Sequence, residues 1–340
     1  TEYGFDQSLT NFEGMGPKLL PLTLKPGQDP AKPGKIWGDA ERLGKGVRWM
    51  QRSEITEGFV DEAIPFMKKA VKEGKPFYVN LWPDDVHSPF WPPVDKWGHG
   101  KRELYLSVLQ EADRQLGSLF DRIRQDASLR DNTLILVCSD NGPESGAGVA
   151  GPFRGYKTQL YEGGIRVPFL ARWPAKLPAG ETYDAPVHHV DIYATAAAAA
   201  AADMPADRIM DGVDLTPYVT ANVTGSKRMD APHEYLFFRG GAAQAVRDQR
   251  WKLVVSAPPQ SGRKQSPRKE WLFDLTAKGE RVDLLAEHPE VASRLRGALE
   301  AHNEAQAEPL WPWITTKATN IDRDLSQQDQ PEDEFIYMSN

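Results

Sequence analysis

The stretch NTLILVCSDNG, Asn132 to Gly142, decides the fold class of this chain. Its apolar run has the length and composition of a buried strand, and it ends in an acid, an amide and a glycine. Before it, residues 104–125 repeat apolar side chains at helical spacing, and after it VPFLARW, residues 167–173, predicts another strand. Because strands and helices alternate, we predict an α/β fold with a largely parallel central sheet and helices on both faces.

The residues upstream extend this pattern. SEITEGFVDEAIPFMKKAVKEGK, residues 53–75, predicts a helix that starts at Ser53 or Thr56 and ends at Gly74. PFYVNLW, residues 76–82, predicts a strand covered on both faces. The Pro- and Gly-rich segment from Thr1 to about Gly46 predicts an exposed and largely irregular connection with little core.

The residues downstream predict a second unit. HHVDIYATAAAAAAADM, residues 188–204, indicates a helix capped by Asp191. The runs EYLFFR, AQAVRD, RWKLVVS and EWLFDL predict a four-stranded antiparallel sheet, and PEVASRLRGALEAHNEA predicts a helix after it. We therefore divide the chain into an α/β domain, residues 1–225, and a C-terminal antiparallel subdomain with its tail, residues 226–340. The tail from about Pro309 is predicted to be loop.

Composition narrows the class of protein. The chain has 340 residues, 40% of them hydrophobic, and no apolar run approaches the roughly 20 residues of a membrane-spanning helix. Its net charge of −7 argues against a nucleic-acid partner, because phosphate binding relies on concentrated Lys and Arg. A single cysteine excludes an intrachain disulfide and leaves the cellular compartment open.

Polar side chains follow two of the predicted strands. Asp140 and Asn141 end one strand, while Asp84, Asp85 and His87 follow the other. Ligands of α/β proteins bind beyond the carboxyl ends of strands, and carboxylate and amide oxygens suit Ca²⁺ or Mg²⁺. The alternative is that Asp140 and Asn141 only form a turn, since both residue types hydrogen-bond their own backbone there.

The segment CSDNGPESGAGVAGPFRGYKTQLYEGGIRVPFLARWP, residues 138–174, closely resembles the second signature region of the type I sulfatases, in the alkaline phosphatase superfamily. YGFDQSL, DEAIPFMKK, PFYVNLWPDDVHSPFWPP and AVRDQRWKLV also fall in the family's order. The resemblance implies an alkaline phosphatase/sulfatase-like fold and a sulfuric ester hydrolase. Its substrate would be a sulfated carbohydrate or an aryl sulfate, and the resemblance suggests a protein of the periplasm or the cell exterior.

The resemblance also implies roles for four residues. Asp140 and Asn141 would be ligands of the active-site Ca²⁺, with Mg²⁺ as an alternative. Lys157 would contact a sulfate oxygen, and His87 would lie near the ester oxygen as sulfate donor or general acid. Arg154 and Glu162, in the same signature, are interpreted as structural residues that fix the loop presenting Lys157.

The family's nucleophile motif does not occur in this sequence. That motif reads Cys or Ser, any residue, Pro, any residue, Arg, and its first residue becomes formylglycine. Cys138 matches no nucleophile position, and we interpret it as a small buried apolar residue. The expectation is a piece of a longer sulfatase, with the formylglycine and the other metal-binding acids upstream of Thr1. A phosphatase or phosphodiesterase of the same superfamily, and an inert fragment with the sulfatase fold, are the alternatives.

Overall fold

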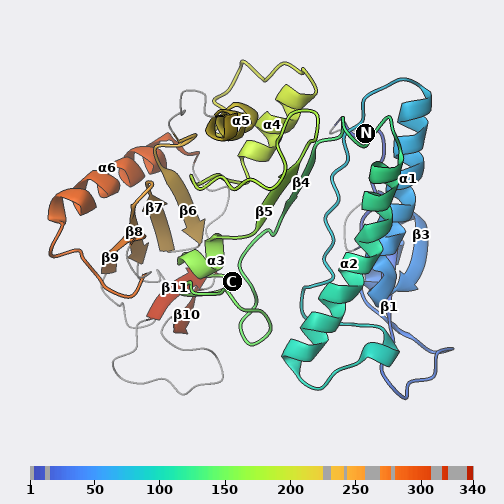
Figure 1. Cartoon of the computed structure of the whole chain (residues 1–340). Coiled ribbons are helices and arrows are strands. Elements are labelled where there is room, and N and C mark those ends of the chain that lie inside the picture. The colour runs from blue at the N-terminus through green and yellow to red at the C-terminus, as the bar shows by residue number, and fades with distance from the viewer. Residues whose placement is uncertain are drawn as a thin grey trace. The chain divides into compact units, whose positions relative to one another are not determined.

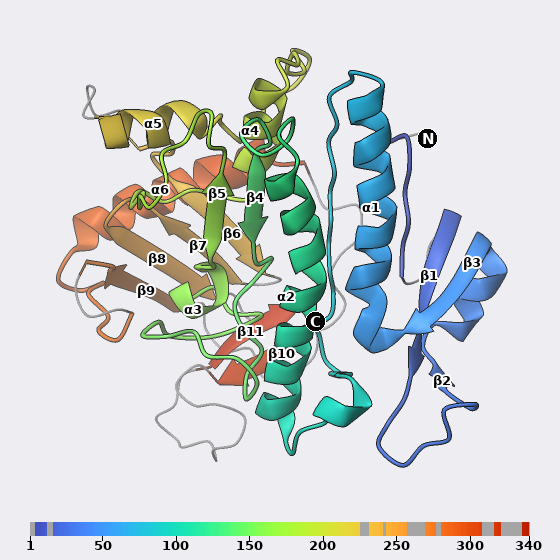
Figure 2. The ribbon, with the colours of Figure 1, turned by 45° about the vertical axis from the view of Figure 1, so that its right-hand side comes forward.

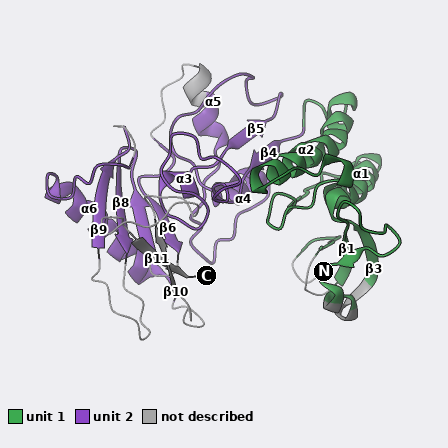
Figure 3. Ribbon diagram, turned by 90° about the horizontal axis from the view of Figure 1, so that it is seen from below, with its two compact units in different colours: residues 1–132 green, residues 133–340 purple. Residues whose placement is uncertain are grey.

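The chain forms two compact units, residues 1–132 and residues 133–340 (Figure 3). A computed structural model describes residues 4–11, 16–224, 231–240, 243–256, 269–276, 280–307, 316–320 and 335–339. The boundary predicted near residue 225 stays a prediction.

A three-stranded sheet opens unit 1. Strand β1, Gly16–Thr23, pairs antiparallel with β2, Gly34–Lys35, and parallel with β3, Gly44–Gln51. Leu19 and Leu20 of β1 are buried, so the prediction of an irregular, coreless segment up to Gly46 is wrong. The parallel partner lies more than twenty residues away in sequence, where local patterning does not reveal it. The turn-rich part between β1 and β2 is largely exposed, as predicted.

Two long helices, α1 (Ile55–Lys72) and α2 (Lys101–Gln125), pack against each other in unit 1 (Figure 2). Both were predicted from periodicity. The start of α1 carries no side-chain cap of its own. Instead Gln115 of α2 donates to the Ser53 carbonyl at 2.6 Å and accepts from the Glu57 N–H at 2.7 Å. The helix start is therefore satisfied by a tertiary contact rather than by the predicted Ser53 or Thr56.

Residues 76–82 are extended but form no strand, so the predicted buried strand is wrong in this structure. Exposure alternates along them, and the outward side chains include Tyr78 at 49% and Trp82 at 80% exposed. An apolar run indicates that a segment can form a buried strand, but a strand also needs a neighbouring strand to which its backbone is hydrogen-bonded.

In unit 2, strand β4 (Ile135–Cys138) pairs antiparallel with β5 (Phe169–Arg172). Short helix α3 (Glu162–Ile165) lies in the loop between them, and α4 (Asp191–Ala199) and α5 (Thr216–Thr224) follow β5. Both strands were predicted, but Val137 is 40% and Leu170 62% exposed, so they are less buried than expected. The described sheets are thus mixed, with β1 and β3 supplying the parallel pairing.

A four-stranded antiparallel sheet follows, in the order β6-β7-β8-β9, as predicted (Figure 1). Its strands are Leu236–Gly240, Ala243–Arg247, Trp251–Ser256 and Lys269–Asp274. Helix α6, Pro289–Ala305, covers one face through Leu295 and Leu299. Leu160 and Tyr161, next to α3, pack on the other face against Val254 and Phe273. The sheet is therefore buried on both sides.

Two further strands, β10 (Thr316–Asn320) and β11 (Phe335–Ser339), pair antiparallel near the C-terminus. The prediction of loop from Pro309 onward is wrong for these ten residues. The two strands bond to each other's backbone, and the sequence pattern of either segment alone does not reveal this pairing. Among the helices in the described parts of the chain, none combines the length and apolarity needed to cross a membrane.

Candidate functional site

The end of strand β4 carries two of the predicted site residues. Asp140 is exposed, and its Oδ1 accepts the backbone N–H of Asn141 at 2.9 Å. Ser139 Oγ donates to the Asn141 carbonyl at 2.9 Å. These bonds form the turn that the sequence left as an alternative, and they leave carboxylate and amide oxygens at a strand end.

Glycines join this turn to helix α3. The Gly142 N–H donates to the Gly164 carbonyl at 2.8 Å. A methyl group at Gly142 would lie 2.0 Å from the Gly163 oxygen, and one at Gly163 would lie 2.1 Å from the Gly155 oxygen. Backbone segments this close admit only glycine. The SDNG and EGG segments therefore lie in a fixed position relative to each other, with Gly142 against Gly163 and Gly164.

The backbone of Lys157 is held at the same place. Its N–H donates to the carbonyl of Pro143 at 2.9 Å, two residues beyond Asn141. Thr158 has φ +76°, a left-handed conformation that β-branched residues rarely adopt. The buried Gln159 closes this turn, with its N–H bonded to the Tyr156 carbonyl at 3.0 Å. The structure thus brings Asp140, Asn141 and the Lys157 backbone to one end of β4.

The donor chemistry at β4 fits part of a site for a hard cation. Asp140 offers a carboxylate and Asn141 an amide oxygen, both suited to Ca²⁺ or Mg²⁺. Within the described ranges, no group of three or more His, Cys, Asp or Glu side chains is arranged to hold a metal ion. These two residues would therefore supply part of a ligand set.

His87 belongs to unit 1, in an exposed loop after the extended segment 76–82. Its Nδ1 lies 2.7 Å from the Ser88 carbonyl, which only accepts hydrogen bonds. Nδ1 therefore carries a proton, and Nε2 is the nitrogen that takes up or gives up the second one.

The two acids before His87 anchor its loop. Asp85 is 5% exposed and accepts a hydrogen bond from the Thr56 hydroxyl. Burial, above all, raises the pKa of Asp85. Arg52 Nη2 donates to the Asp84 carbonyl at 2.6 Å, and its Nη1 lies 3.1 Å from Asp84 Oδ1. These contacts indicate that both acids hold the loop in place.

Sequence reasoning missed two histidines near the end of β4. His189 Nε2 lies 2.8 Å from the Ser139 carbonyl. His233 Nε2 lies 2.8 Å from Oδ1 of the fully buried Asp191. Burial alone would raise the pKa of Asp191, but the bond from His233 and two backbone N–H bonds lower it. Asp191 is the first residue of α4, and the N-cap is Val190 without a side-chain cap bond, so the predicted cap is wrong. The paired histidine in HHVD was a sequence signal for His189 but not for His233.

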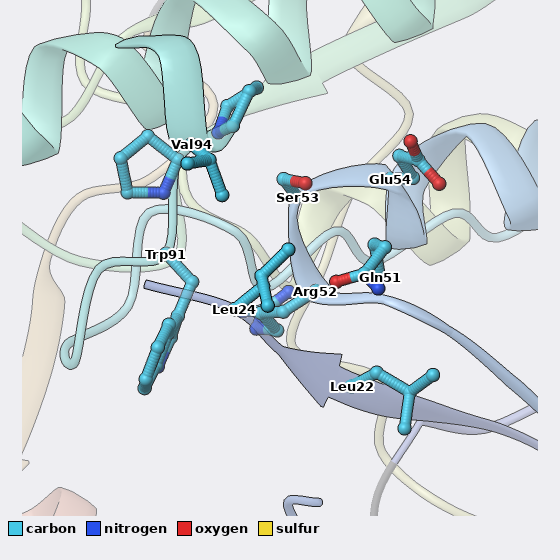
Figure 4. A pocket seen from close by; sticks show the side chains of 10 residues that line it. Leu22, Leu24, Gln51, Arg52, Ser53, Glu54, Trp91 and Val94 are labelled. Atoms are coloured by element: carbon cyan, nitrogen blue, oxygen red, sulfur yellow. The ribbon is translucent and has the colours of Figure 1, made fainter. Parts of the chain in front are cut away.

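A cavity of about 180 Å³ lies within unit 1, and none of the four predicted site residues is among those that line it (Figure 4). Its walls are formed by Leu22, Leu24, Gln51, Arg52, Ser53, Glu54, Trp91, Pro92, Pro93 and Val94. Trp91 packs edge to face on Trp97, with ring centroids 5.7 Å apart. Trp91 and Trp97 therefore hold a loop in place, while Trp82 is exposed.

Comparison with solved structures identifies the class of fold. The crystal structure of Ps i-CgsB in complex with k-i-k-neocarrahexaose superposes with a TM-score of 0.64 at 27% identity, over 77% of this chain and 57% of that one. The putative sulfatase yidJ from Bacteroides fragilis, at 17% identity, has the same fold with a TM-score of 0.52 over 80% of this chain and 60% of that one. These likenesses confirm the predicted α/β fold of the sulfatase type.

Sequence comparison then gives the family. The family model described as Sulfatase matches residues 27–202, just over half of the chain. A second, described as N-sulphoglucosamine sulphohydrolase, C-terminal, matches residues 153–293. The chain belongs to the sulfatase family.

Curated relatives agree with this assignment. N-acetylgalactosamine-6-sulfatase of Canis lupus familiaris is 30% identical over 57% of this chain and 37% of its own length. Arylsulfatase G of Rattus norvegicus is 31% identical over 59% of this chain and 40% of its own length. The chain therefore spans about two fifths of the length of these relatives.

Proposed function

We propose that the complete protein hydrolyses sulfate esters, and that this chain contributes Asp140, Asn141, Lys157 and His87 to its active site. The observation that carries the proposal is the locked register of the signature glycines, which holds the Lys157 backbone beside the Asp140 turn. A simple turn does not require backbone segments packed so closely that only glycine fits between them. Such close packing suits a site in which two loops must present charged groups to one small anion.

The roles follow from the chemistry of each side chain. The Lys157 ammonium would neutralise charge on a non-bridging sulfate oxygen, and this interaction strengthens as the ester bond breaks. His87 would donate the Nε2 proton to the departing alkoxide, because its Nδ1 proton is engaged with Ser88. Asp140 and Asn141 would hold a Ca²⁺ ion, with Mg²⁺ as the alternative. A formylglycine upstream of this chain and the bound cation would supply the nucleophile and further charge neutralisation.

The substrate we propose is a sulfated saccharide. One relative is named N-acetylgalactosamine-6-sulfatase, and one structural neighbour is a complex with k-i-k-neocarrahexaose. The exposed Trp82, five residues before His87, provides an indole face on which a sugar ring could stack. Aryl sulfate is the second substrate class to assay.

The test is turnover by the complete enzyme with Lys157→Ala. We expect kcat/KM for sulfate release to fall by about 10²- to 10³-fold, the usual effect of removing one group that stabilises developing charge. The exposed Lys176, in the same unit, provides the control Lys176→Ala, which should be unchanged. Full activity of folded Lys157→Ala would contradict the proposed role.

The same assay separates the alternatives. Matched sulfate and phosphate esters of one alcohol distinguish a sulfatase from a phosphatase or phosphodiesterase of the superfamily. Release of neither anion by the folded complete protein would favour the inert, ligand-binding alternative.

A further inference from the structure

Three buried charged residues meet beneath helix α3. Glu162 is 4%, Lys252 0% and Glu280 1% exposed. Lys252 Nζ lies 3.1 Å from Glu162 Oε1 and 2.7 Å from Glu280 Oε1. The Glu162 N–H also donates to Glu280 Oε2 at 2.6 Å. A lysine of β8 thus bridges two carboxylates that are 118 residues apart.

A second cation reaches the same carboxylate. Arg247 Nη1 of β7 lies 2.9 Å from Glu162 Oε2. Arg247 and Lys252 are direct partners in the β7–β8 ladder, and strand alternation places them on the face that carries Val254. Like charges directly opposite on a sheet are unfavourable without a counter-charge. This face of the sheet is therefore built to receive Glu162.

The cluster fixes both sides of the loop that contains Lys157. Glu162 begins α3, and its neighbours Gly163 and Gly164 touch the backbone of residues 154–159. On the other side, Arg154 Nη1 donates to the Glu280 carbonyl at 2.8 Å, and its guanidinium lies 4.4 Å from the Tyr161 ring centroid. The loop from Arg154 to Glu162 is thus clamped onto the C-terminal sheet at both ends.

Stability alone does not explain such a cluster. Buried ion pairs are often no more stabilising than apolar side chains of the same volume, because desolvation cancels much of the attraction. Burial raises the pKa of Glu162, but Lys252 and Arg247 lower it further, so the carboxylate stays ionised at neutral pH. Beyond stability, the ion pairs fix the position of Glu162 relative to the sheet.

We propose that Lys252, Arg247 and Glu280 are positioning residues, which act through Glu162 to hold the Lys157 loop in register with Asp140 and Asn141. The C-terminal sheet is then a support of the active site rather than an appendage. The expected effect of these residues on catalysis rests on the proposed function of Lys157. Their effect on the position of the loop does not depend on that function.

Hydrogen exchange on the 340-residue chain tests the geometry without any activity. In Lys252→Met we expect amides of residues 140–166 to exchange at least about tenfold faster, while the β8–β9 ladder stays protected. Arg296→Met is the matched control. Arg296 belongs to α6, on the opposite face of the sheet, and its Nη2 lies 2.5 Å from Glu270 Oε2. Unchanged loop exchange in Lys252→Met would overturn the proposal. Should that variant not fold, Glu162→Gln gives the same measurement under the same criterion.

A quadruple variant separates positioning from simple stabilisation. Glu162→Gln, Arg247→Met, Lys252→Met and Glu280→Gln together remove all four charges of the cluster, so that no buried charge is left without a partner. We expect the melting temperature to recover relative to Lys252→Met, while loop exchange stays fast and kcat of the complete enzyme stays at least about tenfold low. Recovery of both melting temperature and kcat would show a purely structural role and overturn the proposal.

The two proposals fail in different ways. Full activity of Lys157→Ala contradicts the proposed function and leaves the exchange result standing. A loop that stays protected in Lys252→Met contradicts positioning and leaves the Lys157 result standing.

Discussion

Cys138 ends strand β4, two residues before Asp140, and the structure leaves its thiol partly exposed. The sequence-based interpretation of Cys138 as a small buried apolar residue is therefore wrong in its burial. Burial, followed by the negative charge of Asp140, raises the pKa of the Cys138 thiol. Since the thiolate is the reactive form, this environment suppresses nucleophilic chemistry rather than promoting it.

We expect Cys138 to react with iodoacetamide more slowly at pH 7.5 than cysteine in a short peptide, with the rate still rising above about pH 8.5. Asp140→Asn should speed the reaction, because it removes one cause of the raised pKa. Asp203→Asn, at an exposed position, is the control and should change nothing. Alkylation faster than the peptide would show that the thiol is activated. In the complete enzyme, Cys138→Ala should keep most of the turnover.

At the scale of elements, the contact between α1 and α2 depends on one buried acid. Glu111 of α2 is 5% exposed and accepts hydrogen bonds from Lys96 at 2.8 Å and Arg114 at 2.6 Å. Its Oε1 also accepts from Gln115, the residue that satisfies the start of α1. Burial works to raise the pKa of Glu111, but these hydrogen bonds outweigh it and lower the pKa to about 2.

The lowered pKa predicts how the stability of unit 1 depends on pH. A carboxyl group with a lowered folded-state pKa stabilises above its ordinary pKa of about 4.5, and that contribution is lost as pH falls toward about 2. We expect Glu111→Gln to reduce the free energy of unfolding by about 1–3 kcal/mol at pH 7, with the difference disappearing near pH 2. Urea titrations followed by hydrogen exchange of α1 and α2 would measure it.

The control for this prediction is Glu73→Gln. Glu73 pairs with Lys75 at 2.9 Å on the surface, where solvent screens the pair, so its loss should change the free energy of unfolding far less than Glu111→Gln does. A Glu111→Gln effect that persists undiminished at pH 2 would show that the charge of Glu111 is not its cause.

For the molecule as a whole, the donor count predicts how the 340-residue chain responds to calcium. High-affinity Ca²⁺ sites use six to eight oxygen ligands, and Asp140 and Asn141 supply two side chains. We expect calorimetry to give a dissociation constant weaker than about 1 mM, and EDTA to leave the melting temperature unchanged. Micromolar binding that Asp140→Asn abolishes would show that the chain completes the site itself.

Local patterning was sufficient for elements that carry their own signal. Helices α1, α2 and α6 bury one face at helical spacing, and strands β6 to β9 are short runs separated by turns. The glycines of SDNG and EGG, in contrast, are explained by a contact between segments distant in sequence, because a methyl group at Gly142 would lie 2.0 Å from the Gly163 oxygen.

The tertiary structure alone decided what depends on distant partners. Strand β1 exists because β3 pairs with it, and residues 76–82, which look more like a strand, form none. Likewise Gln115 satisfies the start of α1 from another helix, and Lys252 meets Glu162 from 90 residues away. A periodic pattern records which face of an element is buried, whereas pairing and charge partners depend on which segments meet. The sequence by itself therefore determined the elements with their own periodic signal and predicted the candidate-site residues, and only the fold decided which segments pair and what holds the site loop in place.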